Sequence, residues 1–171
     1  MYDRQREFRF AWKCPLWFCF AGLVGLLVWT GAAYAAPDSA RQQVVYHISD
    51  GDPDRQRSAL RNVANHLNIL GDDGADIVVV LQGDGVTLLL RPDAQPQLPG
   101  GLSANATGEV RIGIEDLRLR GVRFEVCAHS LARRGIDDDR YLLDVDPADL
   151  VPSGIDELVR LQRAGYTYIK P

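Results

Sequence analysis

The chain has 171 residues, of which 46% are hydrophobic and 25% are charged, and its formal net charge is −4. Setting aside the N-terminal segment 1–35, with four basic and two acidic residues, leaves 15 basic and 21 acidic groups. This acidic balance argues against a nucleic-acid partner and a polybasic membrane patch, both of which need a basic face. The remainder, about 136 residues, is enough for one domain.

The N-terminus has the order of a secretory signal peptide. Basic residues precede an uncharged stretch over 14–36, and a small-residue A-x-A site ends at Ala35. We place cleavage there, treat 36–42 as a linker and assign 43–171 to the folded domain, which we expect in the periplasm. The alternative is an uncleaved inner-membrane anchor, because an uncharged run of this length can span a bilayer.

The first half of the domain alternates strands and helices. VVYHI (44–48) predicts a buried strand, and a helix follows from Pro53 to Leu70, with Asp52 as N-cap. DIVVVL (76–81) is apolar on both faces, which is typical of a parallel sheet covered by helices. QGDG and then VTLLLR follow, and we predict a helix over VTLLLR. Prolines and glycines punctuate 91–108, where Asn105 begins an N-A-T sequon that we interpret as chance.

The second half continues the alternation. EVRIGIEDLRLRGV (109–122) fits either a helix or a strand, and we favour a helix because parallel strands need a crossover. VRFEV (122–126) predicts a strand, and AHSLARR a short helix that stops at Gly135. An acidic connection over 137–150 has room for a short strand. Ser153 opens a last helix, whose apolar face we assign to Ile155, Leu158 and Val159, and YTYI (166–169) predicts a final strand.

Three loops follow predicted strands, and together they form the predicted site. In open α/β sheets ligands bind beyond the carboxyl ends of the strands. Cys127 would begin a helix there, where the partial positive charge favours a thiolate. The supporting residues that we assign to the pocket are Asp50, Gly51, Gly83, Asp84, Gly85, Ala128, His129 and Ser130. The alternative is a buried, inert Cys127, because free cysteine is among the most buried residue types.

Other chemistries lack their motifs. His129 is two residues from Cys127, so the two side chains do not face each other on a helix. His47 lies inside a predicted strand, away from the edge loops, and His66 is expected at the surface of the first helix. No zinc spacing, EF-hand loop, phosphate loop or hydrolase elbow is found, and we expect no metal or cofactor.

Four segments carry a resemblance to a known family. They are VVYHISDGD (44–52), VVVLQGDGV (78–86), GVRFEVCAHSLARRG (121–135) and VPSGIDELVRLQRAGYTYIKP (151–171). Together they resemble the DsrE/DsrF-like family. The resemblance implies a three-layer α/β sandwich with a mostly parallel sheet of about five strands and a flavodoxin-like topology.

The resemblance also implies a function. Family members assemble as trimers or hexamers, and several carry sulfur as a persulfide on a cysteine placed like Cys127. We therefore expect an exported, homo-oligomeric sulfur carrier of the sulfurtransferase type, which exchanges sulfur with a donor or acceptor protein. The competing hypothesis is a non-catalytic oligomer that binds a small ligand or scaffolds a partner around a structural Cys127. A third is a thiol-redox protein whose partner cysteine comes from another chain.

Overall fold

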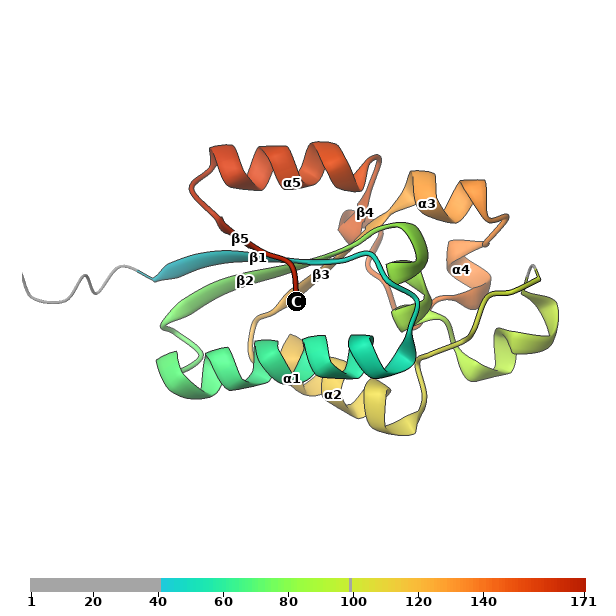
Figure 1. Ribbon diagram of the computed structural model, residues 1–171, viewed down its shortest axis with the longest axis horizontal. Coiled ribbons are helices and arrows are strands. Elements are labelled where there is room, and N and C mark those ends of the chain that lie inside the picture. Colours follow the sequence, from blue (N-terminus) through green and yellow to red (C-terminus); the bar gives the residue numbers. More distant parts are fainter. Residues whose placement is uncertain (1–40, 99) are drawn as a thin grey trace, which may run out of the picture. The chain divides into compact units, whose positions relative to one another are not determined.

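Five parallel strands form the centre of the domain in the computed structural model, which describes residues 41–98 and 100–171 (Figure 1). The strands are β1 (Gln42–Ile48), β2 (Ala75–Leu81), β3 (Arg123–Cys127), β4 (Leu150–Val151) and β5 (Thr167–Ile169). Their order across the sheet is β4-β3-β2-β1-β5, and every neighbouring pair is parallel. The predicted signal peptide and most of the linker lie outside the described residues.

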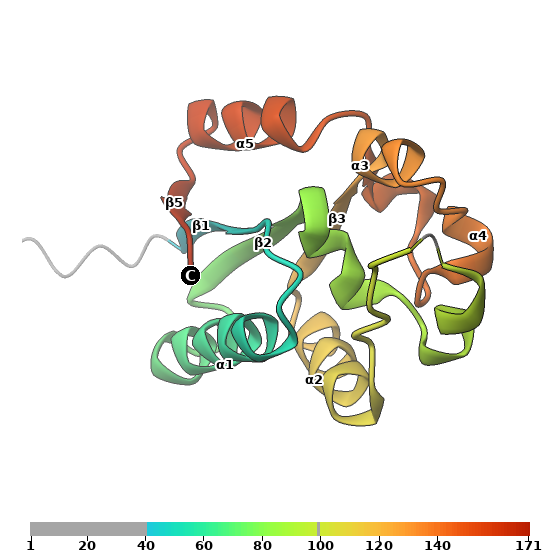
Figure 2. The same ribbon diagram turned by 45° about the vertical axis from the view of Figure 1, so that its right-hand side comes forward.

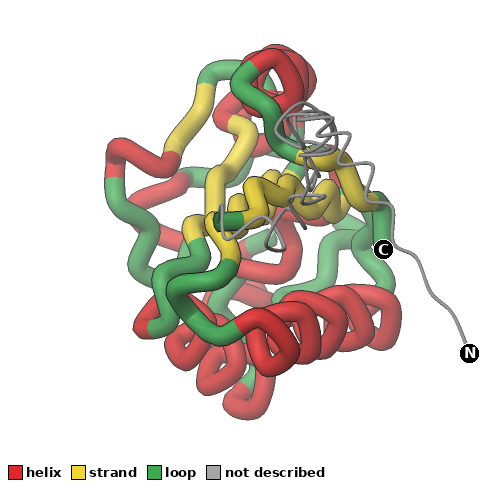
Figure 3. Tube along the Cα trace, turned by 90° about the vertical axis from the view of Figure 1, so that its left-hand side faces the viewer, coloured by secondary structure: helices red, strands yellow, loops and turns green. Residues whose placement is uncertain are grey.

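Helices cover both faces of this sheet. The α-helices are α1 (Pro53–Leu70), α2 (Gly108–Leu119), α3 (Ala128–Arg133), α4 (Asp138–Tyr141) and α5 (Gly154–Arg163), and the 3-10 helices are η1 (Gly83–Leu89), η2 (Pro92–Gln97) and η3 (Pro147–Asp149). Two turned views place α1 and α2 on one face of the sheet and α5 on the other (Figures 2 and 3). The predicted three-layer α/β class is confirmed. The resemblance implied a flavodoxin-like topology, but the strand order is 4-3-2-1-5, whereas that of flavodoxin is 2-1-3-4-5.

Two apolar clusters of unequal size hold these layers together. The larger one joins α1, α2 and η1 to the sheet and includes Phe124 and Val126 of β3. The smaller one lies under α5 and consists of Val45, Val78, Val80, Leu158, Leu161 and Tyr166. Because hydrophobic stabilisation grows with the apolar area buried, the layer formed by α5 contributes less of the core than the layer formed by α1, α2 and η1.

The first helix forms as its sequence predicts. The Asp52 side chain accepts hydrogen bonds from the backbone N–H groups of Asp54 and Arg55, and Pro53 occupies the first turn. Gly71 ends the helix with a φ of 77°, a left-handed conformation that glycine adopts without steric cost.

The segment between β2 and α2 is more ordered than its sequence suggests. VTLLLR was predicted to be a helix of unspecified type, and η1 is a 3-10 helix whose leucines are fully buried. Asn105 is also buried, and its amide donates to Gly51 O, Gln56 Oε1 and Thr87 Oγ1 over 2.9–3.1 Å. These hydrogen bonds anchor the loop before α2 to the β1–α1 loop, to α1 and to η1, and they keep the Asn105 side chain of the sequon buried.

In the C-terminal part the predicted short strand and last helix are confirmed, but the predicted buried face of that helix is wrong. A short strand, β4, begins at the end of the acidic connection, and Ser153 caps α5 by accepting from the N–H of Asp156. The buried face of α5 consists of Gly154, Glu157, Leu158 and Leu161, at the spacing of one helical stripe. Ile155 and Val159, which we had assigned to this face, are exposed.

None of the helices within the described residues is long and apolar enough to cross a membrane.

Candidate functional site

The strand registers define which side chains face α5. Val126 and Phe124 point to the large core, so Glu125 and Cys127 point to the opposite face, where α5 lies. His47, Val80 and Glu125 form one row across β1, β2 and β3. Gln82 follows β2 and lies beside Cys127 in the next row, because Leu81 pairs with Val126. Cys127, Gln82, His47 and Glu125 therefore lie on the same face of the sheet.

Cys127 is the last residue of β3 and is covered by the start of α5. The residue is 2% exposed, and it is the free cysteine of the described chain. A Cβ built on Gly154 would lie 3.3 Å from the Cys127 Cβ and 3.2 Å from the Gln82 Cβ. The absence of a side chain at Gly154 therefore lets α5 approach these two residues closely.

The start of α3 also lies at this position. Cys127 occupies the N-cap position of α3 in an extended conformation, as predicted, although its side chain makes no capping hydrogen bond. The His129 N–H donates to Pro152 O over 3.3 Å, which links α3 to the segment preceding α5. The thiol thus lies at the carboxyl edge of the sheet, enclosed by neighbouring segments.

His47 is a buried neighbour that we had expected to be remote from the site. Its Nδ1 lies 2.8 Å from the hydroxyl of Tyr168, while its buried Nε2 has no hydrogen-bond partner among the described residues. Burial lowers the pKa of His47, the nearby Lys170 ammonium lowers it further, and a polar side-chain contact with Gln82 opposes both effects. These effects favour a neutral imidazole beside Gln82.

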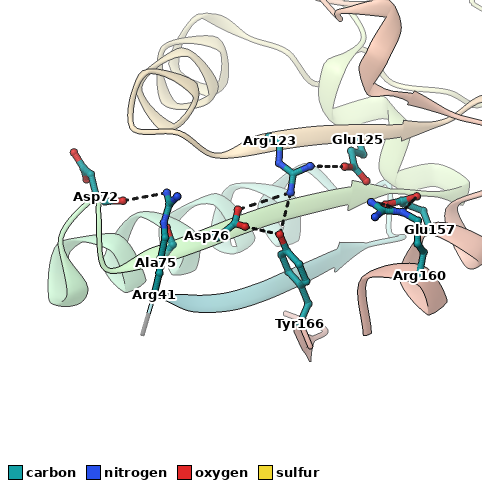
Figure 4. A network of polar contacts seen from close by, with 9 residues as sticks. All are labelled: Arg41, Asp72, Ala75, Asp76, Arg123, Glu125, Glu157, Arg160 and Tyr166. Carbon is teal, nitrogen blue, oxygen red and sulfur yellow. Dashed lines mark hydrogen bonds and ion pairs between the residues drawn. The ribbon is translucent and has the colours of Figure 1, made fainter. Parts of the chain in front are cut away.

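Figure 4 shows the side chains of Glu125, from β3, and Glu157, from α5, on the same face of the sheet. Glu125 Oε1 accepts from Arg123 Nη1 over 3.3 Å, and Glu157 accepts from Arg160 Nε over 2.9 Å. Burial, followed by the charge of Glu157 and a hydrogen bond with it, raises the pKa of Glu125 to about 7. The hydrogen bond from Arg160 lowers the pKa of Glu157.

The cluster extends toward the opposite edge of the sheet through a tyrosine. Tyr166 donates to the carboxylate of Asp76 and accepts from Arg123 Nη2 over 3.1 Å (Figure 4). Arg123 also lies 3.7 Å from Asp76 Oδ1. Burial, followed by Asp76, raises the pKa of Tyr166, so its phenol stays protonated at neutral pH.

The loops that follow β1, β2 and β3 contact one another at the carboxyl edge of the sheet. These contacts do not involve the Cys127 sulfur. The Gly83 N–H donates to Ser130 Oγ over 2.9 Å, and Asp84 forms an ion pair with Arg134. A Cβ on Gly51 would lie 3.0 Å from the Asp84 Cβ. Of the residues assigned to the pocket, these four thus connect the three loops.

The other predicted pocket residues have different positions. Gly85 packs directly against the backbone of Ile48, since a Cβ there would lie 2.0 Å from the Ile48 oxygen. Ala128 is half-buried and His129 exposed. Asp50 lines a separate cavity of about 200 Å³ with His47, Arg55 and Lys170. The hydrogen bond from the Asp52 N–H lowers the pKa of Asp50.

The QGDG loop, which begins at Gln82, was assigned to the pocket from the sequence, but four residues on this face of the sheet were missed: His47, Glu125, Gly154 and Glu157. Strand alternation could have found Glu125, because it is two residues before Cys127 and must share its face. The others depend on how strands and α5 pack. Among the described residues, no group of three or more His, Cys, Asp or Glu side chains is arranged to hold a metal ion.

This architecture defines a small parallel α/β domain with a cysteine at the end of its third strand. Residues 42–171 match the DsrE/DsrF-like family, and the chain belongs to that family. A similar solved structure is MTH1491, a protein of unknown function from Methanobacterium thermoautotrophicum. It is 32% identical, with a TM-score of 0.60, over 76% of this chain and 99% of that chain. No curated protein matches the sequence.

Proposed function

We propose that the protein carries sulfane sulfur as a persulfide on Cys127. The observation that carries the proposal is the position of this thiol, which ends a central parallel strand next to Gln82, at the point where α5 begins. An inert space-filling cysteine would typically have apolar neighbours. Here Gln82 lies beside Cys127, and Glu125 shares its face of β3 two residues earlier.

The chemistry requires one thiol of this protein, a persulfide donor and a thiol acceptor, and no second cysteine of this protein. The Cys127 thiolate attacks the outer sulfur of a donor persulfide, an S–S bond forms at Cys127, and the donor's thiolate leaves with the electron pair of the broken bond. An acceptor thiolate later takes the outer sulfur by the same exchange and releases the Cys127 thiolate. A nearby cysteine would attack the persulfide and discharge it, and Cys127 has no such neighbour among the described residues.

Access to the sulfur requires a local movement. With Cys127 2% exposed, a donor reaches it only when Gly154 and the first turn of α5 move away. Such burial protects a bound persulfide from small thiols between loading and delivery. The small apolar cluster that holds α5 is consistent with local opening there.

The setting of this activity is also part of the proposal. We infer that the protein is exported to the periplasm, forms a homo-oligomer and receives sulfur from a donor protein during sulfur-compound metabolism. Subunit contacts would then contribute to the surface around the start of α5.

The competing function is a binding or scaffold module with a structural Cys127. The 2% exposure of the residue favours this alternative. In that case the thiol would serve only to fill space under Gly154.

The intact mass of the protein after incubation with a low-molecular-weight persulfide distinguishes the two functions. The carrier gains one sulfur atom, which a reductant removes. The matched control is Cys127→Ala in the full chain, which keeps Cys14 and Cys19 and must gain one sulfur atom fewer than the unmutated protein. Absence of the adduct on the unmutated protein would instead support the scaffold.

A further inference from the structure

Glu125 and Glu157 place two carboxyl groups together between the sheet and α5. Glu125 is 5% exposed and Glu157 is 9% exposed, so water screens their charges poorly. Two ionised carboxylates in contact at such a site repel each other, and one of them is expected to keep a proton.

The hydrogen bonds of the two glutamates indicate which of them is protonated. Arg160 holds both oxygens of Glu157, through its Nε at 2.9 Å, which favours the ionised form of that carboxylate. Glu125 receives one hydrogen bond from Arg123 on Oε1, and its buried Oε2 has no donor partner among the described residues. A proton on Glu125 removes this unsatisfied acceptor and gives the carboxyl a donor toward Glu157.

We infer that Glu125 and Glu157 share one proton, and that this proton latches the first turns of α5 onto the sheet above Cys127. Glu157 is three residues after Gly154, which covers the thiol, and Glu125 is two residues before Cys127 on the same strand face. A proton shared by the two glutamates therefore holds closed the segment that must move for the sulfur to be reached. The role of this latch in sulfur transfer rests on the proposed function.

The other charged groups around the pair do not replace the proton. Arg123 and Arg160 lower the pKa of Glu125, but burial and Glu157 outweigh them and leave it at about 7. His47, across Val80 in the same row, has a lowered pKa and is neutral near pH 7. Beyond Arg123 lie Asp76, Tyr166 and Asp149.

The direction of the pH effect follows from the raised pKa of Glu125. When α5 opens, water reaches the carboxyl and its pKa returns toward the ordinary value of 4.5. The latch is therefore complete below pH 4.5, weakens as the pH rises from 4.5 to about 7, and stays weak above it. If about one pKa unit of the shift comes from contact with α5, opening increases about tenfold across this range.

Hydrogen–deuterium exchange of the Gly154–Leu158 amides tests the latch without any sulfur chemistry. After correction for intrinsic exchange rates, we expect protection in the full chain to fall about tenfold between pH 5 and pH 7.5. Glu125→Gln, which keeps the shape of a protonated glutamate, should keep the same protection at both pH values. Glu109→Gln, at an exposed position of α2, should behave as the unmutated protein.

A second variant keeps the test valid if Glu125→Gln fails to fold. Glu157→Gln leaves Glu125 without an ionised neighbour and should also reduce the pH effect. Equal protection at the two pH values in the unmutated protein would overturn the inference, as would an undiminished fall in both glutamine variants. Because persulfide loading is a separate measurement, failure of the latch and failure of the carrier function are distinguishable.

Discussion

Gly154 lies over Cys127 so closely that a Cβ on the glycine would come within 3.3 Å of the cysteine Cβ. A larger side chain at residue 154 must therefore push α5 away from the sheet or displace Gln82. We expect Gly154→Val to destabilise the domain by about 1–3 kcal/mol, the usual cost of overpacking. Thiol labelling of the folded protein should become faster, as measured with a coloured disulfide reagent.

The matched control for this change is Gly113→Ala on α2. A Cβ at Gly113 meets no atom within 4 Å, and alanine favours a helix by up to about 1 kcal/mol over glycine. This variant should be as stable as the unmutated protein or more so, with unchanged labelling. Slower labelling in Gly154→Val would contradict the proposed cover over the sulfur.

The raised pKa of Glu125 predicts a pH dependence of global stability. Because the pKa of Glu125 is raised to about 7 in the folded state, the free energy of unfolding of the protein falls as the pH rises from 4.5 to 7. Above pH 7 this group causes no further loss. The rise of the pKa of Glu125 from 4.5 to about 7 sets an upper limit of about 3 kcal/mol, and we expect about 1–2 kcal/mol after relaxation of the site. Urea unfolding at pH 5 and pH 7.5 measures this difference.

The Glu125→Gln variant isolates this contribution. Its free energy of unfolding should decline less between the two pH values than that of the unmutated protein. Glu115→Gln, at an exposed position of α2, serves as the control and should retain the full decline. A decline of the same size in Glu125→Gln would show that other groups cause it.

His47 should titrate below its ordinary pKa of 6.5, because burial and the Lys170 ammonium both disfavour the imidazolium. Lys170→Gln removes the ammonium and should raise the pKa of His47, although burial will keep it below the ordinary value. An NMR titration of the ring protons gives both values. Arg133→Gln, at an exposed position of α3, should leave the titration unchanged; a pKa of His47 above 6.5 would refute the assignment.

Asn105 should matter for stability because its buried amide donates to three oxygens. Asn105→Ala leaves those acceptors short of a donor and opens a small void, so we expect a loss of about 2–4 kcal/mol. Chemical denaturation measures the loss. Asn62→Ala, at an exposed position of α1, should change stability by less than about 0.5 kcal/mol.

Much of this fold could be predicted from the sequence because each element has a local signal. Strand residues such as those at 76–81 are apolar on both faces, which predicts a covered parallel sheet. Asp52 and Gly71 mark the two ends of α1 through capping and backbone conformation. The position of Cys127 at the end of a strand also follows from such local patterns.

The surroundings of Cys127 could not be predicted in this way, because they depend on long-range packing. Gln82 lies beside Cys127 only through the register of β2 and β3, which are more than forty positions apart along the chain. The face of α5 was assigned to Ile155 and Val159 from hydrophobicity, yet Gly154 and Glu157 face the sheet. A glycine and a glutamate on a buried face reflect what lies beneath them, and no local pattern contains that information.

The central claim is that the Cys127 thiol reacts in the folded protein, and its labelling rate compared with the global unfolding rate tests this most directly. The rate in the full chain is measured at neutral pH, with Cys127→Ala subtracting labelling at Cys14 and Cys19. Our account predicts labelling that is much faster than global unfolding, because only the first turns of α5 need to open. Labelling no faster than global unfolding would show a sealed structural thiol and contradict the carrier function.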